Sequence, residues 1–526
     1  MDNKFAFLAL RGWRARGLDV LVGALAILGH APFHIWPVTL GCFIYLFLRL
    51  DRMPAGITKP GFGRGFWFAL GYFAASTYWI MSAFVARGPE FIWLAPPMVF
   101  GLATLMAFFW GVAGGLFTRV KPKGIVRSLF FVSLVFLAEF ARGHVFGGFP
   151  WNLPGYIFKA GGAFSQFASV GGVYGLSFAV LLVVGLIAGA SGTRKPVLSY
   201  AGAGLIMASL WGFGAWRLSG ANIKYVEGPL LRIVKVQFDQ KDQFNPDKSM
   251  DIINQFLTQS IAPGLENVTH IIWPEGAVGG LAVENTELIR VMGELMSRDT
   301  ATPPIWLLNS LRHEIKPNNN GEPQDIYYNT LAAIEFDTTG VATIIGYNDK
   351  VRLVPFGEFI PGEDMLKSFG PKSLSTSLFS MTPGLEKLTS TIKGLPRVSP
   401  QICYEIIFSG LTPQSPRPDW ILNQSNDAWY GNSLGPRQHA NIAQYRAIEE
   451  GVPVIRSASN GISGSIDPYG RFLEKVEIQE TRSLDVRLPV SIKETVFFAN
   501  FNWFLLLLNL LPCIIYTMLT CYKKPD

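Results

Sequence analysis

The chain has 526 residues, of which 49% are hydrophobic and 16% are charged, whereas an ordinary soluble protein carries about 25% charged residues. This composition excludes a wholly water-soluble globule, and it also excludes a disordered chain, which buries too little apolar surface to fold. The net charge of +7 resides in short clusters of Lys and Arg between apolar segments, a pattern of membrane topology rather than of nucleic-acid binding.

A series of apolar segments fills the chain from Leu18 to Arg217. A hydrocarbon core about 30 Å thick needs roughly 20 helical residues to cross it, so these segments predict transmembrane helices. We expect seven spans in this region and an eighth near the C-terminus, at 18–33, 36–50, 65–85, 91–117, 125–146, 164–190, 197–216 and 502–521. The first two are short and lie close together, so a single re-entrant hairpin is an alternative to two spans. No small-residue cleavage site follows the first apolar run, so we expect that segment to be retained.

Basic residues are concentrated in alternate loops, and this asymmetry orients the predicted bundle. The basic loops and termini contain Lys4, Arg11, Arg14, Arg16, Arg49, Arg52, Lys59, Arg64, Arg119, Lys121, Lys123, Arg127, Arg194, Lys195, Lys523 and Lys524. The other loops contain only Arg87, Arg142 and Lys159. By the positive-inside rule, both termini are cytoplasmic and the segment between the seventh and eighth spans is extracytoplasmic.

That segment has a different composition and predicts a separate domain. Its β-like runs, LRIVKVQF, THIIW, PIWLLN, VATIIGY and WILN, alternate with helical or polar stretches. About 270 residues are enough for one α/β domain. We therefore predict a membrane domain over 1–222, an extracytoplasmic catalytic domain over 223–491, and a final span with a cytoplasmic tail over 492–526.

Three reactive side chains in this segment each follow a β-like run. Glu275 comes after THIIWP, Lys350 after VATIIGYND and Cys403 after RVSPQI. Ligands bind at the ends of strands in α/β sheets, because loops from distant parts of the chain meet there. A carboxylate, an amine and a thiol brought together predict covalent acyl chemistry. The carboxylate accepts the thiol proton, and the ammonium lowers the thiol pKa and stabilises the oxyanion.

Each of these residues also has a plainer interpretation. A single Glu or Lys after a strand is usually a solvated loop charge, and a single Cys is more often a buried apolar residue. However, Cys42, Cys513 and Cys521 lie in or beside apolar segments, so Cys403 alone lies in polar sequence. An unpaired thiol in an oxidising compartment is a liability unless its reactivity is used, which favours the catalytic interpretation.

The motifs around these residues resemble a known superfamily. The runs WPEGA, NDKVRLVPFGEFIP and ICYEIIF resemble the Glu-Lys-Cys motifs of the nitrilase superfamily. The runs LNQSNDAWYGNSLGPRQH and AQYRAIEEGVPVIRSASNGISGSID narrow the resemblance to the apolipoprotein N-acyltransferases. The resemblance implies a polytopic α-helical membrane bundle of about eight spans with an inserted nitrilase-like α/β domain, an αββα sandwich. It also implies the bacterial inner (cytoplasmic) membrane, with the catalytic domain in the periplasm.

The resemblance implies a role for six residues of the insert. Glu275 matches the general base, Lys350 the oxyanion-stabilising lysine and Cys403 the nucleophile that becomes acylated. Three further residues match supporting positions of the family. These are Glu358, which orients the lysine, and Tyr404 and Glu405, which follow the nucleophile.

Five aromatic residues are expected to contact lipid. Phe244 stands where the family has a tryptophan, and Trp151 lies in the family's Phe-Pro-Trp segment. The other three are Phe369, Phe379 and Trp429. Phe369 and Phe379 belong to the apolar, Gly- and Pro-containing segment 359–396. That segment is either a mobile lid that dips into the outer leaflet or a buried excursion that covers the domain core.

The function implied by the resemblance is acyl transfer in two half-reactions. Cys403 takes an acyl chain from a phospholipid, expected to be phosphatidylethanolamine, and forms a thioester. The α-amine of the diacylglyceryl-cysteine of an apolipoprotein then takes the chain as an amide. No cofactor, metal or nucleic acid is expected. One alternative is a membrane-tethered amidase or nitrilase that hydrolyses a C–N bond. Another is a transporter with an outer solute-binding domain, which the scarcity of charge within the spans beyond Glu139 disfavours.

Two other features have structural interpretations. The glycines of 61–65 and 111–115 lie in apolar spans, where small residues allow close packing of helices, and do not form phosphate-binding loops. His439 lies at helical spacing after the NDAWYG run, which favours a structural hydrogen-bonding group over a catalytic base.

Overall fold

The computed structural model describes residues 10–318, 321–359, 380–386 and 389–497, together with Leu506 and Leu510; for Phe244, Pro246 and Asp299 it describes the backbone alone. These residues form two compact units. The first contains the described residues of Met1–Ala221, Asn432–Glu450 and Glu494–Asp526, and the second consists of Asn222–Gly431 and Gly451–Lys493.

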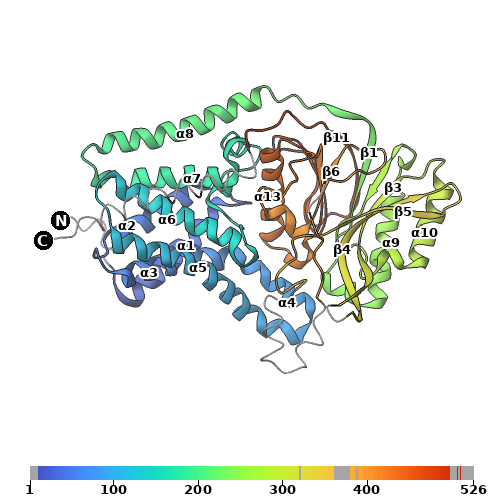
Figure 1. The fold of residues 1–526 in the computed structure, drawn as a ribbon, viewed down its shortest axis with the longest axis horizontal. Coiled ribbons are helices and arrows are strands. Elements are labelled where there is room, and N and C mark those ends of the chain that lie inside the picture. The colour runs from blue at the N-terminus through green and yellow to red at the C-terminus, as the bar shows by residue number, and fades with distance from the viewer. Residues whose placement is uncertain are drawn as a thin grey trace. The chain divides into compact units, whose positions relative to one another are not determined.

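The first unit is helical (Figure 1). Its α-helices within the described residues are α1 (Gly12–Leu25), α2 (Trp36–Asp51), α3 (Thr58–Thr77), α4 (Met81–Arg87), α5 (Ala95–Val120), α6 (Ile125–His144), α7 (Ala168–Gly189), α8 (Pro196–Ser219) and α13 (Gly435–Glu450). Short 3-10 segments continue several of these helices, so that α3 and α4 form one long apolar run and α7 extends at both ends.

Four helical segments are long and apolar enough to cross a bilayer, judged among the described residues by length and composition. They are Thr58–Arg87, Pro89–Val120, Phe164–Gly192 and Pro196–Ser219. Helices α1 and α2 have 14 and 16 residues, fewer than the roughly 20 that a crossing needs. Helix α6 has 20 residues but carries Arg127 and the buried pair Glu139 and Arg142. The eight-span count is therefore not confirmed, and the final segment 502–521 lies almost wholly outside the described residues.

Helices α3 and α5 approach each other closely through glycine. A Cβ atom on Gly61 would collide with the carbonyl oxygen of Gly114, and one on Gly65 would collide with that of Trp110. No larger residue fits at either position without moving a backbone, because protein interiors are close-packed. The packing interpretation of these glycine-rich segments is confirmed at these positions.

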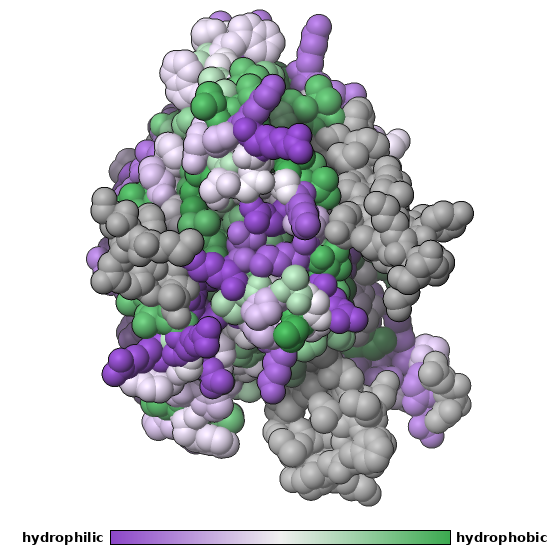
Figure 2. All heavy atoms as spheres, turned by 90° about the vertical axis from the view of Figure 1, so that its left-hand side faces the viewer, coloured by the Kyte–Doolittle hydropathy of each residue, from purple (hydrophilic) through white to green (hydrophobic). Residues whose placement is uncertain are grey.

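Figure 2 shows a face of the first unit, seen from the left-hand side of Figure 1. Hydrophilic side chains gather there between apolar ones (Figure 2). Several basic residues of the predicted cytoplasmic loops hold these loops together. Arg119 donates to the Gly56 carbonyl at 2.6 Å, and Arg127 pairs with Asp51 at 2.8 Å. These contacts join neighbouring basic loops, and the side of the membrane that the loops face remains a prediction.

Helix α13 follows a strand of the predicted catalytic segment, yet it packs within the first unit. Gln438 accepts a hydrogen bond from the Trp151 indole at 2.7 Å. Glu449 accepts the backbone N–H of Val173 at 2.7 Å and pairs with Arg446 at 3.0 Å. All of these side chains are buried, and buried charges require such partners. The helix is therefore anchored specifically in the first unit.

The second unit contains two β-sheets. Its strands are β1 (Tyr225–Lys235), β2 (His270–Ile272), β3 (Ile305–Pro317), β4 (Pro323–Phe336), β5 (Ala342–Asp349), β6 (Val398–Ile402), β7 (Trp420–Asn426), β8 (Val454–Ser459), β9 (Ser463–Ile466), β10 (Phe472–Val476) and β11 (Arg482–Pro489). The first sheet has the order β11-β1-β2-β3-β4-β5, and the second has the order β10-β9-β8-β7-β6. Strands β1 to β3 are mutually parallel, as are β6 to β8.

The sheets face each other across a hydrophobic core, and successive residues of each strand point to opposite faces. Ile233 and Leu307 of the first sheet pack with Ile402 and Leu422 of the second. Helices α9 (Pro246–Ser260) and α10 (Thr286–Asp299) cover the other face of the first sheet, in a second core around Trp306 (Figure 1). This layered arrangement confirms the predicted α/β sandwich.

Candidate active site

Three strand ends bring Glu275, Lys350 and Cys403 together in the second unit. Glu275 lies three residues beyond β2, Lys350 directly follows β5, and Cys403 directly follows β6. The first two strands belong to one sheet and β6 to the other, so the site spans the gap between the sheets. Gln424 of β7 ties the sheets together nearby, since its amide donates to the Trp273 carbonyl at 2.6 Å. The convergence expected from the sequence is therefore observed, while the catalytic roles remain proposals.

Lys350 lies between two carboxylates. Its Nζ is 2.7 Å from Oε1 of Glu358 and 3.3 Å from Oε1 of Glu275, and the ammonium is 1% exposed. Burial alone lowers the pKa of Lys350, but the two carboxylates outweigh burial and raise this pKa above its ordinary value. The lysine is therefore a fixed positive charge at neutral pH.

Cys403 begins a tight turn at the end of β6. Its φ is +47°, a left-handed conformation that costs energy for a residue with a side chain, and it presents the sulfur at the strand end. Burial raises the pKa of the thiol well above its ordinary value, and Glu275 raises it further through its charge and a hydrogen bond. Lys350 acts in the opposite direction but does not prevail. The ammonium therefore lowers the thiol pKa as the sequence predicts, but burial outweighs it, and the resting sulfur is a thiol that needs a base.

Two asparagines that the sequence analysis did not single out hold Glu275 in place. The side chain of Asn329, on β4, donates to Oε1 of Glu275 at 2.8 Å and to Oε1 of Glu358 at 2.9 Å. The backbone N–H of Asn426, at the end of β7, donates to Oε2 of Glu275 at 3.0 Å. A polar residue inside the apolar run of β4 is a signal that could have identified Asn329, because buried amides need partners.

Glu405 is buried and ties two loops of the site together. Its Oε2 accepts the N–H of Ile402 at 2.8 Å, and its Oε1 accepts the N–H groups of Val351 at 2.8 Å and Arg352 at 3.2 Å. The turn with the nucleophile is thereby fixed to the residues that follow Lys350. The supporting role expected of Glu405 remains a proposal, and this geometry is the observation on which it rests.

Two tyrosines lie beside Cys403. Tyr404 is buried, its ring lies edge-on to that of Phe408, and burial raises the pKa of its phenol. The hydroxyl of Tyr430 lies 4.0 Å from the sulfur of Cys403. Burial and the adjacent Cys403 raise the pKa of Tyr430, so its hydroxyl stays protonated and can donate to the sulfur. Tyr430 was not singled out from the sequence.

Of the five residues predicted to contact lipid, the structure describes the side chains of two, Trp151 and Trp429. Trp151 belongs to the first unit, where its ring is 2% exposed and packs beside that of Trp79. Trp429 is half-buried next to Tyr430 in the second unit. The side chain of Phe244, and all of Phe369 and Phe379, lie outside the described residues. The lipid-contacting roles of all five residues therefore remain predictions.

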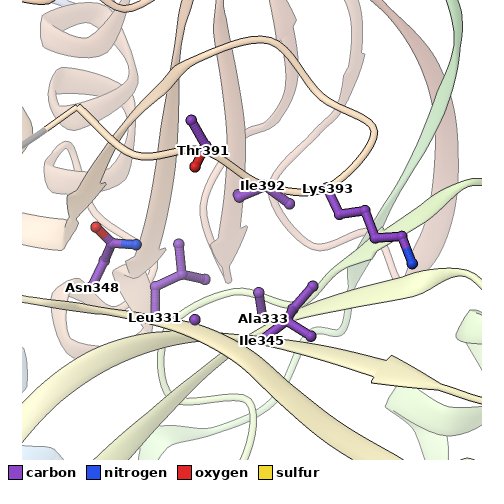
Figure 3. A pocket seen from close by; sticks show the side chains of 8 residues that line it. Leu331, Ala333, Ile345, Asn348, Thr391, Ile392 and Lys393 are labelled. Carbon is purple, nitrogen blue, oxygen red and sulfur yellow. The ribbon is translucent and has the colours of Figure 1, made fainter.

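A small cavity of about 140 Å³ lies between strands β4 and β5 and the segment 391–393 (Figure 3). Leu331, Ala333, Ile345 and Ile392 supply its apolar lining, and Asn348, Thr391 and Lys393 supply polar groups. None of its lining residues belongs to the Glu-Lys-Cys cluster. The cavity thus lies farther along the sheet and is not the space that holds the reacting atoms.

Two protein families match the chain over separate regions. The apolipoprotein N-acyltransferase N-terminal domain matches residues 22–186, and the carbon-nitrogen hydrolase domain matches residues 244–489. The second match covers the Glu-Lys-Cys cluster and every strand of the two sheets except β1. Part of the first, helical unit and most of the second, α/β unit thus each match a known protein family.

Relatives of similar length match nearly the whole chain. The apolipoprotein N-acyltransferase of Caulobacter vibrioides is 34% identical over 489 residues, which cover 91% of this chain and 90% of the relative. The corresponding protein of Rhodopseudomonas palustris is 31% identical over 501 residues, which cover 92% and 91% of the two chains. Among solved structures, an amidase from Nesterenkonia sp. AN1 matches 50% of this chain and 93% of its own with 14% identity and a TM-score of 0.30.

Proposed function

Because this chain belongs to the apolipoprotein N-acyltransferase family, we propose that Cys403 carries an acyl group from a phospholipid to the α-amine of an apolipoprotein. The chain is an N-acyltransferase of lipoprotein biosynthesis. One observation supports Cys403 as the carrier. Its thiol lies at a strand end, forms a hydrogen bond with Glu275 and interacts electrostatically with the ammonium of Lys350. A buried thiol with a base beside it is the arrangement that nucleophilic catalysis requires.

In the first half-reaction, Glu275 takes the proton of the Cys403 thiol. The resulting thiolate attacks the ester carbonyl of the phospholipid and forms a tetrahedral intermediate with a negatively charged oxygen. The ammonium of Lys350 stabilises that charge, which is worth far more in a buried site than in water. The intermediate then expels the alkoxide of the lysophospholipid, which takes the proton from Glu275, and a thioester remains on Cys403.

In the second half-reaction, the α-amine of the diacylglyceryl-cysteine attacks the thioester carbonyl. Glu275 accepts a proton from the amine as the C–N bond forms. The C–S bond breaks, and the departing thiolate of Cys403 recovers that proton from Glu275. The products are an amide on the apolipoprotein and the resting thiol, so one carboxylate serves both steps.

Glu358, Glu405 and Tyr404 act on the other residues of the site rather than on the substrates. Glu358 orients the ammonium of Lys350, while its Oε2 is held by the N–H of Val354 at 2.8 Å. Glu405 fixes the distance between the turn at Cys403 and the residues that follow Lys350. Tyr404 is buried next to Cys403 and packs against the ring of Phe408.

The membrane domain brings the site to its substrates. Moving an acyl chain from a bilayer into water costs about 0.8 kcal/mol per CH₂, so a site at the membrane surface avoids a large penalty. The chain is an integral membrane protein. We assign the membrane domain to 1–222, the catalytic domain to 223–491 and the last span with its tail to 492–526. We place it in the bacterial inner membrane, with both termini cytoplasmic and the catalytic domain periplasmic.

Phosphatidylethanolamine is the proposed donor, and the diacylglyceryl-apolipoprotein is the proposed acceptor. Both carry hydrocarbon tails, which fits one lateral route from the bilayer. The lid over 359–396 remains a prediction, because most of that segment lies outside the described residues.

The test is the detection of the acylated nucleophile. Purified full-length protein is incubated with phosphatidylethanolamine that carries a labelled acyl chain, and its intact mass is measured. We expect one labelled acyl adduct per chain, mapped to Cys403 and absent from Cys403→Ala. An adduct elsewhere, or none on the wild-type chain, would overturn the assignment. A membrane-tethered amidase would instead hydrolyse a small amide and form no adduct with the lipid.

A further inference from the structure

Asn329 lies in the middle of β4 and contacts both carboxylates of the site. One N–H of its amide is directed to Oε1 of Glu275 at 2.8 Å, and the other to Oε1 of Glu358 at 2.9 Å. An amide nitrogen carries two protons, so both of its donors are used on carboxylates. Its backbone carbonyl also accepts the N–H of Lys350 at 2.8 Å. Asn329 thus touches three charged residues of the site.

A second asparagine fixes the orientation of this amide. The side-chain oxygen of Asn329 accepts a hydrogen bond from Nδ2 of Asn309, on β3, at 2.7 Å. Asn309 also donates to the Thr330 carbonyl at 3.1 Å and accepts the N–H of Gly276 at 3.3 Å. Reversing the Asn329 amide would place its oxygen against two carboxylate oxygens and its nitrogen against another donor. Only one orientation satisfies the network.

The charges of the cluster explain why a neutral donor is needed. Glu275 and Glu358 share the single ammonium of Lys350, so the buried group of three carries more negative than positive charge. Like charges at close range repel strongly in a buried site. An amide that donates one hydrogen bond to each carboxylate reduces this repulsion and adds no charge.

We propose that Asn329 is a positioning residue that holds Glu275 against Cys403 and apart from Glu358, so that one carboxylate can serve both proton transfers. The proposal rests on the function proposed above for Cys403 and Glu275. Asn329 acts through Glu275 and does not contact the lipid, so it affects the rate of the chemical step and not the binding of substrate.

The experiment measures single-turnover acylation of Cys403 by phosphatidylethanolamine in mixed detergent micelles, as a function of pH and lipid concentration, with the full-length chain. Asn329→Ala removes both donors, and hydrogen bonds to charged groups are strong enough that we expect acylation to slow by about 100-fold. We expect the lipid concentration that gives half the maximal rate to stay the same.

Asn329→Asp separates positioning from packing, because it fills almost the same volume. Above its pKa the new carboxylate repels Glu275 and Glu358, and among two carboxylates that pKa is raised. Once protonated, the new group can donate one hydrogen bond. The rate of Asn329→Asp relative to wild type should therefore increase as pH falls, by up to about tenfold per pH unit, while the relative rate of Asn329→Ala stays flat.

Asn348→Ala is the matched control. Asn348 lies on the neighbouring strand β5, opposite Leu331 in the register, and its side chain bonds Ser390 at the cavity shown in Figure 3. We expect its acylation rate to equal that of wild type. Thermal unfolding of each variant shows whether it is folded. If Asn329→Ala does not fold, the pH dependence of acylation in Asn329→Asp tests the proposal.

Wild-type rates in the Asn329 variants would overturn the proposal. A loss in Asn329→Asp that does not change with pH would also overturn it, since the loss would then not follow the charge of the new carboxylate. If the wild-type chain itself forms no adduct on Cys403, the proposed function fails rather than the role of Asn329. If the wild-type chain is acylated and the Asn329 variants are acylated equally fast, the role of Asn329 alone fails.

Discussion

The carboxylate of Glu405 accepts the backbone N–H of Val351 at 2.8 Å, which joins the turn of the nucleophile to the residue that follows Lys350. The same side chain also holds the N–H of Ile402, the residue before Cys403. A single buried carboxylate thus sets the separation of the sulfur and the ammonium, although it touches neither. Backbone N–H groups are a precise anchor, because their positions are fixed by the strands that precede them.

Replacing Glu405 should therefore impair catalysis through geometry. Glu405→Ala would leave three backbone N–H groups without their acceptor, each at a cost of about 1–3 kcal/mol if buried. We expect a lower unfolding temperature and a strong loss of Cys403 acylation. Thermal unfolding and the intact-mass assay measure the two effects. Glu474→Gln, at an exposed position of β10, is the control and should resemble wild type. Full activity of Glu405→Ala would contradict the positioning role.

Tyr430 should assist the nucleophile through its hydroxyl. Tyr430→Phe keeps the ring and removes the group that lies 4.0 Å from the sulfur. Loss of a donor to the thiolate disfavours the charged form, so alkylation of Cys403 by iodoacetamide should slow by roughly three- to tenfold at neutral pH. Tyr328→Phe, on β4, is the control, since its hydroxyl accepts from Lys316. An alkylation rate unchanged from wild type would show that the hydroxyl does not act on the sulfur.

The reactivity of Cys403 should depend steeply on pH. Burial and Glu275 raise the pKa of this thiol, so the thiolate fraction is small at neutral pH and grows as pH rises. Below the thiol pKa, the alkylation rate should increase about tenfold per pH unit. Lys350→Met removes the nearby positive charge that lowers this pKa, so the pKa should rise further and the rate at a given pH should fall. Faster alkylation of Lys350→Met than of wild type would contradict this electrostatic account.

A variant of Trp151 can distinguish a structural role of this residue from a role in lipid binding. Its indole donates to Gln438 of α13, and the ring is buried within the first unit. Trp151→Phe should lower the free energy of unfolding by about 1–3 kcal/mol, because a buried acceptor loses its donor. We expect the lipid concentration for half-maximal acylation to stay the same. A weaker apparent affinity for lipid with unchanged stability would instead support the lipid contact predicted from the sequence.

The three reactive residues of the site could be predicted from the sequence, because each is identified by the residues directly before it. Glu275, Lys350 and Cys403 each follow a run of β-forming residues, and such runs place the next residue at the edge of a sheet. The α/β class of the second unit followed from the alternation of these runs with helical stretches. The glycine contacts of α3 and α5 were also predictable, since only small residues allow that approach.

Other features depend on contacts between distant segments and could not be predicted in this way. The role of Asn329 follows from two carboxylates in distant loops, so its own neighbours in the sequence mark it as a buried polar residue but do not show what it binds. The pKa of Cys403 is set by burial, which a linear pattern does not measure. The packing of α13 in the first unit depends on buried partners such as Val173, more than 250 residues earlier in the chain.

The most direct test of the thioester account is the transfer of the acyl group from a preloaded enzyme. Full-length protein acylated on Cys403 with a labelled chain is freed of phospholipid and mixed with a diacylglyceryl-cysteine peptide that has a free α-amine. We predict that the label leaves Cys403 and appears as an amide on the peptide at the same rate, while loss to water without the peptide is much slower. Release to water at the same rate with or without peptide, or amide formation by the Cys403→Ala chain supplied with phospholipid, would contradict the account.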